Sequence, residues 1–378
     1  MISIRHYNDT DKTAWDNYAE RHPDGTLYHL SAWKEIIEQT YHHKSFYLIA
    51  SIGRDDPSSP IVGILPLLHL KHFLFGNNLI SIPFFDMAGI LADNVEVEQA
   101  LLSEAIRLGR NLNADTIELR HTTPHGWFSE FSEIPPYAGS HNPVDTPPLS
   151  SRIPAFTCHT KSHKVRMLLD LPDSSEALMK NFKAKLRSQI KKPIKEGLKA
   201  KIGGKELIDA FYNVFTVNMR DLGSPVHSKD LIRSVLEAFP GNARLVAIYK
   251  NKDAIACSLI IGFNHTLENP WASALRSYSP LGPNMLLYWT MLEYACDNGF
   301  KSFDFGRSTP EEGTYKFKEQ WGAKPVPLHW YFFSLNGQPM ANDTTDKSKF
   351  DNAIRYWQKL PVQLTKIVGP MIRKHIGL

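Results

Sequence analysis

One arrangement of apolar segments occurs twice along the chain and limits the folds that it can adopt. In the first half, two apolar stretches at 46–51 and 61–68 flank a polar turn. Farther along, a stretch with helical periodicity at 97–112 leads into an alternating segment at 116–121. The first half therefore predicts a hairpin of buried strands, followed by a helix and a further strand.

The second half repeats these segments in the same order, at 244–250, 254–263, 284–299 and 302–307. A shift of 186 residues places the segment 117–119 on 303–305, and both read apolar–acid–apolar, the alternation of a strand. Chance similarity between helix–strand pairs is the alternative to a duplicated unit. The duplication predicts an α/β (α+β) fold of two related domains, each with a mixed central sheet flanked by helices.

A proline-rich stretch separates the two halves. Residues 122–163 hold seven of the 25 prolines, a density that excludes a regular helix or a central strand. A chain of 378 residues is also longer than one hydrophobic core usually serves. We therefore predict an N-terminal domain at 1–160 that includes this connector, a C-terminal domain at 161–335 and a helical tail at 336–378.

Composition and missing motifs argue against several classes of protein. No apolar run reaches the roughly eighteen residues that span a bilayer, the N-terminus is charged and the three cysteines are widely spaced, so we expect a cytoplasmic protein. The chain lacks G-x-G-x-x-G, G-x-x-x-x-G-K-[ST] and G-x-S-x-G, the motifs of dinucleotide-binding, P-loop and serine hydrolase proteins. Cys158, His159 and His163 are spaced as metal ligands can be, but no carboxylate is near them, so we expect no metal site.

Positive charge is concentrated at the start of the second half. Residues 180–205 contain ten basic residues and one acid, after a capping-box spacing at Asp173 and Glu176. Apolar residues recur every four positions from Phe182 to Leu198 and predict a core-facing stripe. A parallel cationic stripe consists of Lys183, Arg187, Lys191, Lys195 and Lys199, and Pro193 predicts a kink or break. The stripe is either a solvated face or a surface that binds the phosphates of RNA, a nucleotide or a nucleotide-linked sugar.

A lysine lies among aromatic residues in the segment TYKFKEQWG at 314–322. Lys318 follows Phe317 and precedes Trp321 by three positions, and Tyr315 is close by. One interpretation is a surface lysine on an amphipathic segment. The other is an ammonium group in a partly dry pocket, where negative charge develops during a reaction.

Several segments together resemble the FemAB (FemABX) group of transferases, which consist of two tandem domains of the GCN5-related N-acetyltransferase (GNAT) fold. The resemblance rests on SAWKEII at 31–37 and on 63–89 in the first half, and on 185–198, 218–228, 302–322 and 328–333 in the second. NMRDLGSPVH together with FDFGRS and GTYKFKEQWG is most similar to the FemAB-related proteins of exosortase/PEP-CTERM and exopolysaccharide systems. The resemblance implies an acyltransferase or aminoacyltransferase. Its reaction would form an amide on an amine of a cell-envelope or exopolysaccharide-related acceptor, by attack on an activated ester or thioester.

The resemblance also implies roles for individual residues. It places Lys318 beside the oxyanion of a tetrahedral intermediate, with Phe317 and Trp321 excluding water. Arg187 corresponds to an arginine that contacts anionic acceptor groups, and Lys191 is its neighbour on the basic stripe. The other candidates are Asp304, Arg307 and Tyr315 as catalytic residues, and Asn218, Arg220 and His227 as residues that bind substrate. An ion pair that closes a strand is the alternative for Asp304.

Two donors fit this resemblance, aminoacyl-tRNA and acyl-CoA, and no bound cofactor is expected. The acyl-CoA alternative concerns residues 276–289, which lie where acetyl-CoA enzymes bind pyrophosphate but lack the R/Q-x-x-G-x-G/A spacing of those enzymes. A different class is a non-catalytic GNAT-like scaffold that binds glycans or a partner through Trp33, Trp271 and Trp321.

The C-terminal segment 359–378 predicts an amphipathic helix, with Leu360, Leu364, Ile367 and Met371 on one face. Docking of this face on the protein's own surface is one interpretation. Weak contact with an anionic membrane surface is the other. We expect a monomer or a dimer.

Overall fold

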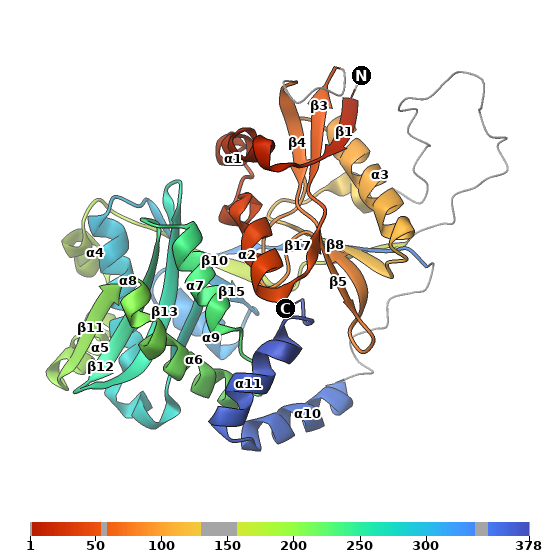
Figure 1. Ribbon diagram of the computed structural model, residues 1–378. Helices are drawn as coiled ribbons and strands as arrows, with labels where there is room; N and C mark the ends of the chain where they lie inside the picture. Colours follow the sequence, from red (N-terminus) through yellow and green to blue (C-terminus); the bar gives the residue numbers. More distant parts are fainter. Residues whose placement is uncertain (1, 54–58, 130–156, 337–346, 378) are drawn as a thin grey trace, which may run out of the picture. The chain divides into compact units, whose positions relative to one another are not determined.

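The computed structural model describes residues 2–53, 59–129, 157–336 and 347–377, which form two compact units (Figure 1). Unit 1 comprises Met1–His163, Pro327–Asn342 and His375–Leu378, and unit 2 comprises Lys164–Val326 and Asp343–Lys374. None of the described helices is both long and apolar enough to cross a bilayer.

The described residues of unit 1 form two sheets and three α-helices. The strands of the first sheet follow the order β1 (Ile2–His6), β3 (Leu48–Ile52), β4 (Ile61–Leu65) and β7 (Leu91–Ala92). The second sheet follows the order β2 (Lys44–Ser45), β5 (Leu68–His72), β6 (Gly76–Ile80), β8 (Thr116–His121), β17 (His329–Ser334) and β9 (Thr157–Lys161). The helices are α1 (Lys12–Arg21), α2 (Ala32–Tyr41) and α3 (Val95–Asn111). The apolar face of α3 packs into a core with residues of β3, β4 and β8.

Unit 2 has one seven-stranded sheet. Its order is β11 (Leu198–Gly203), β12 (Ala243–Lys250), β13 (Asp253–Phe263), β14 (Thr266–Ala274), β15 (Ser302–Ser308), β10 (Val165–Asp170) and β16 (Lys324–Pro327). Its helices are α4 (Ser175–Asn181), α5 (Ala184–Lys195), α6 (Ile208–Leu222), α7 (Lys229–Ala238), α8 (Pro283–Asp297), α9 (Gly313–Glu319), α10 (Lys347–Lys359) and α11 (Val362–Arg373). The core beneath α8 contains residues of α4, α5 and β10–β15.

The two units share the arrangement that the sequence predicts twice. Both predicted hairpins are antiparallel, β3 with β4 and β12 with β13. In each unit a helix then leads into a strand that runs parallel to an earlier one, β8 beside β6 and β15 beside β14. Leu79 pairs with Ile117 in unit 1, and Leu267 pairs with Phe303 in unit 2. The mixed sheets flanked by helices confirm the predicted fold class.

The two compact units are not continuous along the chain. β17 lies within the predicted 161–335 domain, yet it pairs with β8 and β9 inside unit 1. The end of the proline-rich connector forms β9, an edge strand, and its start is ordered by the buried Phe128. Phe131 of the same connector lies outside the described residues.

The predicted basic helix is two helices. Ser174, rather than Asp173, caps α4 by accepting a hydrogen bond from the N–H of Ala177. The chain becomes extended at Phe182 and α5 begins at Ala184, whereas Pro193 lies inside α5 without ending it. Phe182, Leu186 and Ile190 face the core as predicted, but Ile194 is 53% exposed. The helix ends before the stripe does, so Lys199 lies on β11 instead.

The C-terminal tail packs with a face that differs from the predicted one. α11 contacts α6 and buries Thr365 and Gly369, the latter against Val226. Leu364, Ile367 and Met371 of the predicted apolar face are exposed. Pro370 lies within α11 and does not break it. The small residue Gly369 on the opposite side allows α11 to lie close to Val226, in the segment between α6 and α7, which the apolar pattern alone did not indicate.

Candidate functional site

The parallel strands β14 and β15 pair only along their first residues. Their pairing runs from Thr266 opposite Ser302 to Glu268 opposite Asp304, although the strands continue to Ala274 and Ser308. The ladder between β13 and β14 shifts register in the same region. The C-terminal edge of a parallel pair is a frequent site of ligand binding in α/β sheets. The candidate site lies at this edge.

A bulge in β15 creates the binding position of Lys318. The register between β10 and β15 shifts between Arg166 and Leu168, and Gly306 adopts a φ of 75°. The Lys318 ammonium donates to the carbonyl oxygens of Gly306 at 3.0 Å and Arg307 at 2.8 Å. Lys318 is only 7% exposed, so the prediction of a surface lysine is wrong. The bulge and α9 together fix a positive charge at the end of β15.

Aromatic rings surround the base of α9. Phe317 meets Tyr288 of α8 edge to face at a centroid distance of 5.0 Å, and Trp321 meets Phe182 in the same way at 5.6 Å. Tyr288 also stacks on Phe305, and burial raises the pKa of its hydroxyl above the usual value. Trp321 is 1% exposed. These rings pack against one another on the α8 side of β15.

Asp304 is a member of a buried ion pair. Its Oδ2 accepts a hydrogen bond from Nε of Arg166 at 2.9 Å and lies 2.8 Å from Nη2 of the same guanidinium. Its Oδ1 accepts from the N–H of Gly306 at 2.8 Å. Both carboxylate oxygens therefore hold the bulge of β15. Arg307 and Tyr315 are half-buried at the same strand end and on α9. The alternative of a strand-closing ion pair thus describes the contacts of Asp304.

Two of the remaining candidates, Asn218 and His227, contact the opposite face of the sheet. Phe303 and Phe305 belong to the core beneath α8, so Asp304 between them faces the α6 side. On that side the Asn218 amide donates to the Ser273 hydroxyl at 3.0 Å, and the His227 ring lies against Trp271 with centroids 4.9 Å apart.

His227 and Arg220 also contact the C-terminal helices. The Arg373 side chain donates to Nε2 of His227 at 3.0 Å, and burial together with this charge holds the pKa of His227 well below its usual range. Arg220 pairs with Asp221 and donates to the carbonyl oxygen of Leu360, so it is turned toward the connection between α10 and α11. Asn218 and His227 therefore border β14, whereas Arg220 does not.

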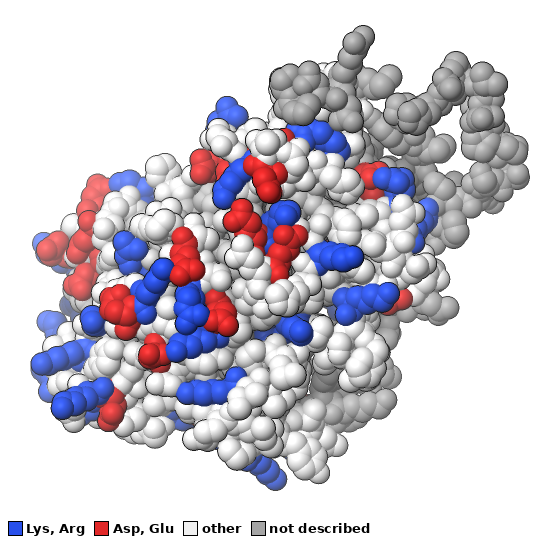
Figure 2. Space-filling model, viewed as in Figure 1, with Lys and Arg blue, Asp and Glu red and all other residues white. Residues whose placement is uncertain are grey.

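The basic helix lies beside the start of α8. Lys192 donates to the carbonyl oxygen of Pro280, and a Cβ on Gly282 would lie 3.9 Å from Pro193. No described side chain caps the N-terminus of α8. An open depression of about 540 Å³ follows α5 and is lined by Arg187, Lys191, Lys192 and Lys195, among others. Figure 2 shows Lys and Arg gathered over the part of unit 2 where Figure 1 places α5 and β11.

The two cations predicted to bind anions differ in their contacts. Arg187 donates to the carbonyl oxygen of Phe182 at 2.5 Å and thereby ties α5 to the end of α4. Lys191 is exposed on the depression. The stripe therefore combines a structural arginine with solvent-facing lysines.

Sequence reasoning missed Arg166 and Tyr288. Arg166 lies 138 residues from Asp304, and nothing in the alternating segment around it identifies its partner. Tyr288 lies in a helix that is apolar on all sides, where a further aromatic residue is not distinctive. The predicted glycan-stacking tryptophans are wrong for Trp33 and Trp321, because both are buried.

The second half of the chain matches a known family. Residues 180–319 match the model described as an acetyltransferase (GNAT) domain, a span that contains the basic helix, β14, β15 and Lys318. A search of curated proteins found no match.

Solved structures of similar fold cover most of the chain. A crystal structure of FemX matches with 15% identity over 88% of this chain and 98% of its own, at a TM-score of 0.61. A structure of L-PGS from Bacillus licheniformis matches with 10% identity over 94% and 99%, at a TM-score of 0.54. A tandem GNAT protein from the clavulanic acid biosynthesis pathway matches with 11% identity over 90% and 100%, at a TM-score of 0.50. The chain therefore has the fold of two tandem GNAT-like domains, and the family match supports an acyltransferase activity.

Proposed function

We propose that unit 2 transfers an acyl or aminoacyl group from a phosphate-bearing carrier to an amine. The observation that carries the proposal is the buried ammonium of Lys318, held by two carbonyl oxygens where β14 and β15 stop pairing. Burying a charge is costly unless the protein uses it or compensates it. A fixed positive charge at an open strand edge suits a reaction in which a carbonyl oxygen becomes negative.

The reaction needs few chemical groups from the protein. The amine nitrogen forms a bond to the carbonyl carbon of the ester or thioester, and the oxygen becomes an oxyanion. The bond to the carrier then breaks, and the carrier leaves as a hydroxyl or thiol that takes up a proton while the amine loses one. Lys318 stabilises the oxyanion through its charge, and the surrounding rings lower the local dielectric constant.

Asp304 positions this charge and does not act as the base. Because its two oxygens accept from Arg166 and Gly306, the carboxylate stabilises the bulge that presents the carbonyl oxygens to Lys318. Arg307 and Tyr315 lie at the same edge and are the groups that we expect to contact the substrate. Asn218 and His227 border the acceptor side through their contacts with β14.

The carrier binds through its phosphates. Lysines of α5 and the uncapped N-terminus of α8 lie side by side, and both attract anions. Acyl-CoA and aminoacyl-tRNA share this chemistry. The family match favours acyl-CoA, whereas a basic depression that follows the whole of α5 is longer than a pyrophosphate requires and favours aminoacyl-tRNA.

We propose an amine of a cell-envelope or exopolysaccharide-related molecule as the acceptor. Support comes from the sequence resemblance to FemAB-related proteins.

A donor screen with charged tRNA and acyl-CoA tests the proposal, with mass detection of the modified amine in extracts of cell-envelope sugars and peptides. An absence of acyl transfer from both donors would favour a non-catalytic scaffold.

The variant Lys318→Met tests the catalytic role. We expect kcat to fall on the order of a hundredfold to a thousandfold, the range for loss of one oxyanion-stabilising group, with little change in substrate affinity. Lys318→Arg should restore little, because a planar guanidinium does not place its charge where an ammonium does.

The control is Lys316→Met, two residues away and exposed on α9. It should leave kcat unchanged. Removing Lys318 also leaves two carbonyl oxygens without this donor, so thermal unfolding of each variant must be measured in parallel. Equal and small effects of the two substitutions on kcat would show that Lys318 only fastens α9 to β15.

A further inference from the structure

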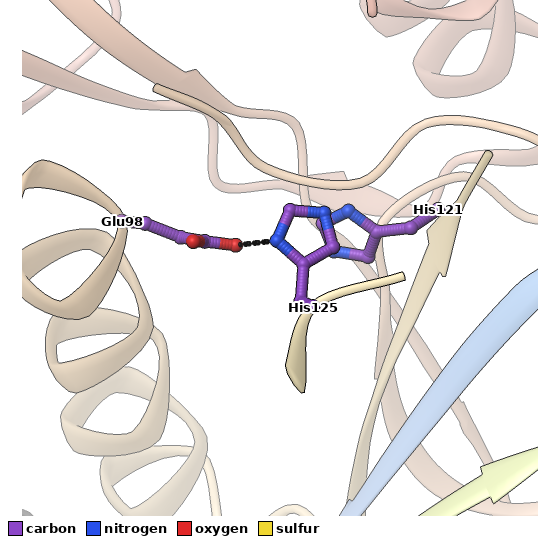
Figure 3. Close-up of side chains that lie close together, drawn as sticks. All are labelled: Glu98, His121 and His125. Atoms are coloured by element: carbon purple, nitrogen blue, oxygen red, sulfur yellow. Dashed lines mark ion pairs between the residues drawn. The ribbon is translucent and has the colours of Figure 1, made fainter. Parts of the chain in front are cut away.

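Three side chains in unit 1 form a buried cluster far along the chain from the transfer site. Glu98 projects from the first turns of α3, His121 ends β8 and His125 follows in the adjacent loop. One nitrogen or oxygen atom from each lies within 4.8 Å of the others. Figure 3 shows the Glu98 carboxylate directed at the His125 imidazole, with the His121 ring beside it. Glu98 and His121 are 5% and 3% exposed.

The surroundings hold each member of the cluster in place. The indole N–H of Trp127 donates to Oε2 of Glu98 at 2.7 Å, which leaves Oε1 directed at His125. The backbone N–H of His125 donates to the Tyr331 hydroxyl at 2.7 Å. The His121 and His125 rings lie with centroids 4.1 Å apart. Hydrogen bonds from outside a metal site orient ligands in this manner.

The polar atoms of the cluster are not fully satisfied by hydrogen bonds among the described residues. Oε1 of Glu98 lies 2.5 Å from Nδ1 of His125, but the geometry is not that of a hydrogen bond, and this oxygen is buried without a hydrogen-bond partner among the described residues. Among the described residues, His121 accepts one long hydrogen bond, of 3.4 Å, from the N–H of Ile90. Neutral imidazole and carboxylate are the forms that bind metals.

We propose that Glu98, His121 and His125 bind a divalent transition-metal ion, with Zn²⁺ as the expected ion. Two imidazole nitrogens and one carboxylate oxygen suit Zn²⁺ better than Mg²⁺ or Ca²⁺, which prefer oxygen ligands. Tetrahedral coordination leaves a fourth position for water.

The metal would fasten the start of the proline-rich connector to the core. Its ligands come from α3, from β8 and from the segment that carries His125, which otherwise attaches through Phe128 and Trp127. The sequence signal is the spacing of two histidines four residues apart, and Glu98 is recognisable only after folding.

The test is metal binding by the untagged full-length protein after chelation and dialysis. We expect one equivalent of Zn²⁺ in competition with a chromophoric chelator. Co²⁺ should give the visible absorption of a four- or five-coordinate site. Zn²⁺ should also raise the thermal unfolding temperature. Failure of the wild-type protein to bind either ion at one equivalent would overturn the proposal, and the cluster would be an ion pair only.

Variants identify the ligands. His125→Gln and Glu98→Gln should each weaken Zn²⁺ binding on the order of a hundredfold or more, the upper range for disturbing such sites. His159→Gln is the matched control, because His159 is an exposed histidine on β9 of the same unit, next to Cys158, and should bind Zn²⁺ as the wild type does. Equal affinity of all three variants would place the metal elsewhere. Circular dichroism of each apo variant separates ligand loss from misfolding.

Discussion

Gly306 determines whether the end of β15 can receive Lys318. Its φ of 75° lies in the left-handed region, and a Cβ at this position would lie 3.1 Å from the carbonyl oxygen of Asn269. Gly306→Ala should therefore destabilise unit 2 by about 1–2 kcal/mol from backbone strain alone. The clash should also shift the carbonyl oxygens that hold Lys318, so we expect kcat to fall at least tenfold. Urea unfolding and steady-state kinetics measure the two effects.

Gly299 supplies the matched control. Its φ is 78°, but a Cβ there would meet nothing within 4 Å. Gly299→Ala should carry the strain without the clash, so that it destabilises unit 2 by about 1 kcal/mol and keeps its kcat. A loss of activity that is equal in both variants would mean that strain in unit 2, and not the position of Lys318, limits turnover.

At the scale of single residues, the sequence predicted the burial of Lys318 but not its contacts. The aromatic setting of Lys318 was visible, and the structure confirms its burial. Its carbonyl partners were not predictable, because they depend on a bulge that forms only when β10 pairs with β15. Ile194 lies in the last turn of α5 and is exposed, although Leu186 and Ile190 of the same helix are buried.

At the scale of elements, α5 is expected to bind phosphates through its exposed lysines. The double variant Lys191→Ala/Lys195→Ala should weaken binding of tRNA or CoA. The slope of log K against log salt should fall by about 0.7 for each phosphate of a single-stranded ligand that the variant no longer neutralises. Arg187 is unsuitable for this test because it also ties α5 to α4. Filter binding at several salt concentrations measures the slope.

The control removes the same charge from the neighbouring strand. Lys199 and Lys201 are exposed on β11 and do not line the depression. Lys199→Ala/Lys201→Ala should leave the salt slope unchanged if binding is local to α5. Equal slopes in the two double variants would instead indicate attraction by the overall charge.

Elements were predictable where periodicity was strong. α3 and the strands after the two long helices were predicted because one-sided burial imposes a period of 3.6 or two residues, whereas the hairpins and α8 were predicted as continuous apolar runs. The break between α4 and α5 at Phe182 was not predicted, because a phenylalanine does not indicate the end of a helix. A proline does indicate one, so the sequence pointed to Pro193 instead. The packed face of α11 was also missed, since Thr365 and Gly369 pack by close approach of small residues and not by apolar character.

At the scale of the whole molecule, the chain order and the units do not coincide. β17 comes after all seven strands of unit 2 in the sequence, but it lies between β8 and β9 in a sheet of unit 1. Local periodicity identifies such a strand but cannot state which sheet it joins, because that depends on pairing partners more than 200 residues away, as the register of Tyr331 with Leu119 shows. The consequence is that unit 1 is completed only by the last part of the chain.

This order predicts an asymmetric effect of truncation. Truncation after Val326 removes one residue, Pro327, from the sheet of unit 2. In unit 1, the same truncation leaves β8 and β9 without the strand that lies between them. Buried Trp330, Tyr331 and Phe333 would also be removed from unit 1. A chain that ends at Asn342 keeps β17 and removes only α10, α11 and the last residues. We expect the chain that ends at Asn342 to keep the native packing around Trp15 and Trp33 of unit 1. The chain that ends at Val326 should aggregate, because exposed sheet edges pair with other chains. Size-exclusion chromatography and near-ultraviolet circular dichroism distinguish the two products. Equal solubility and equal spectra would show that unit 1 folds without β17.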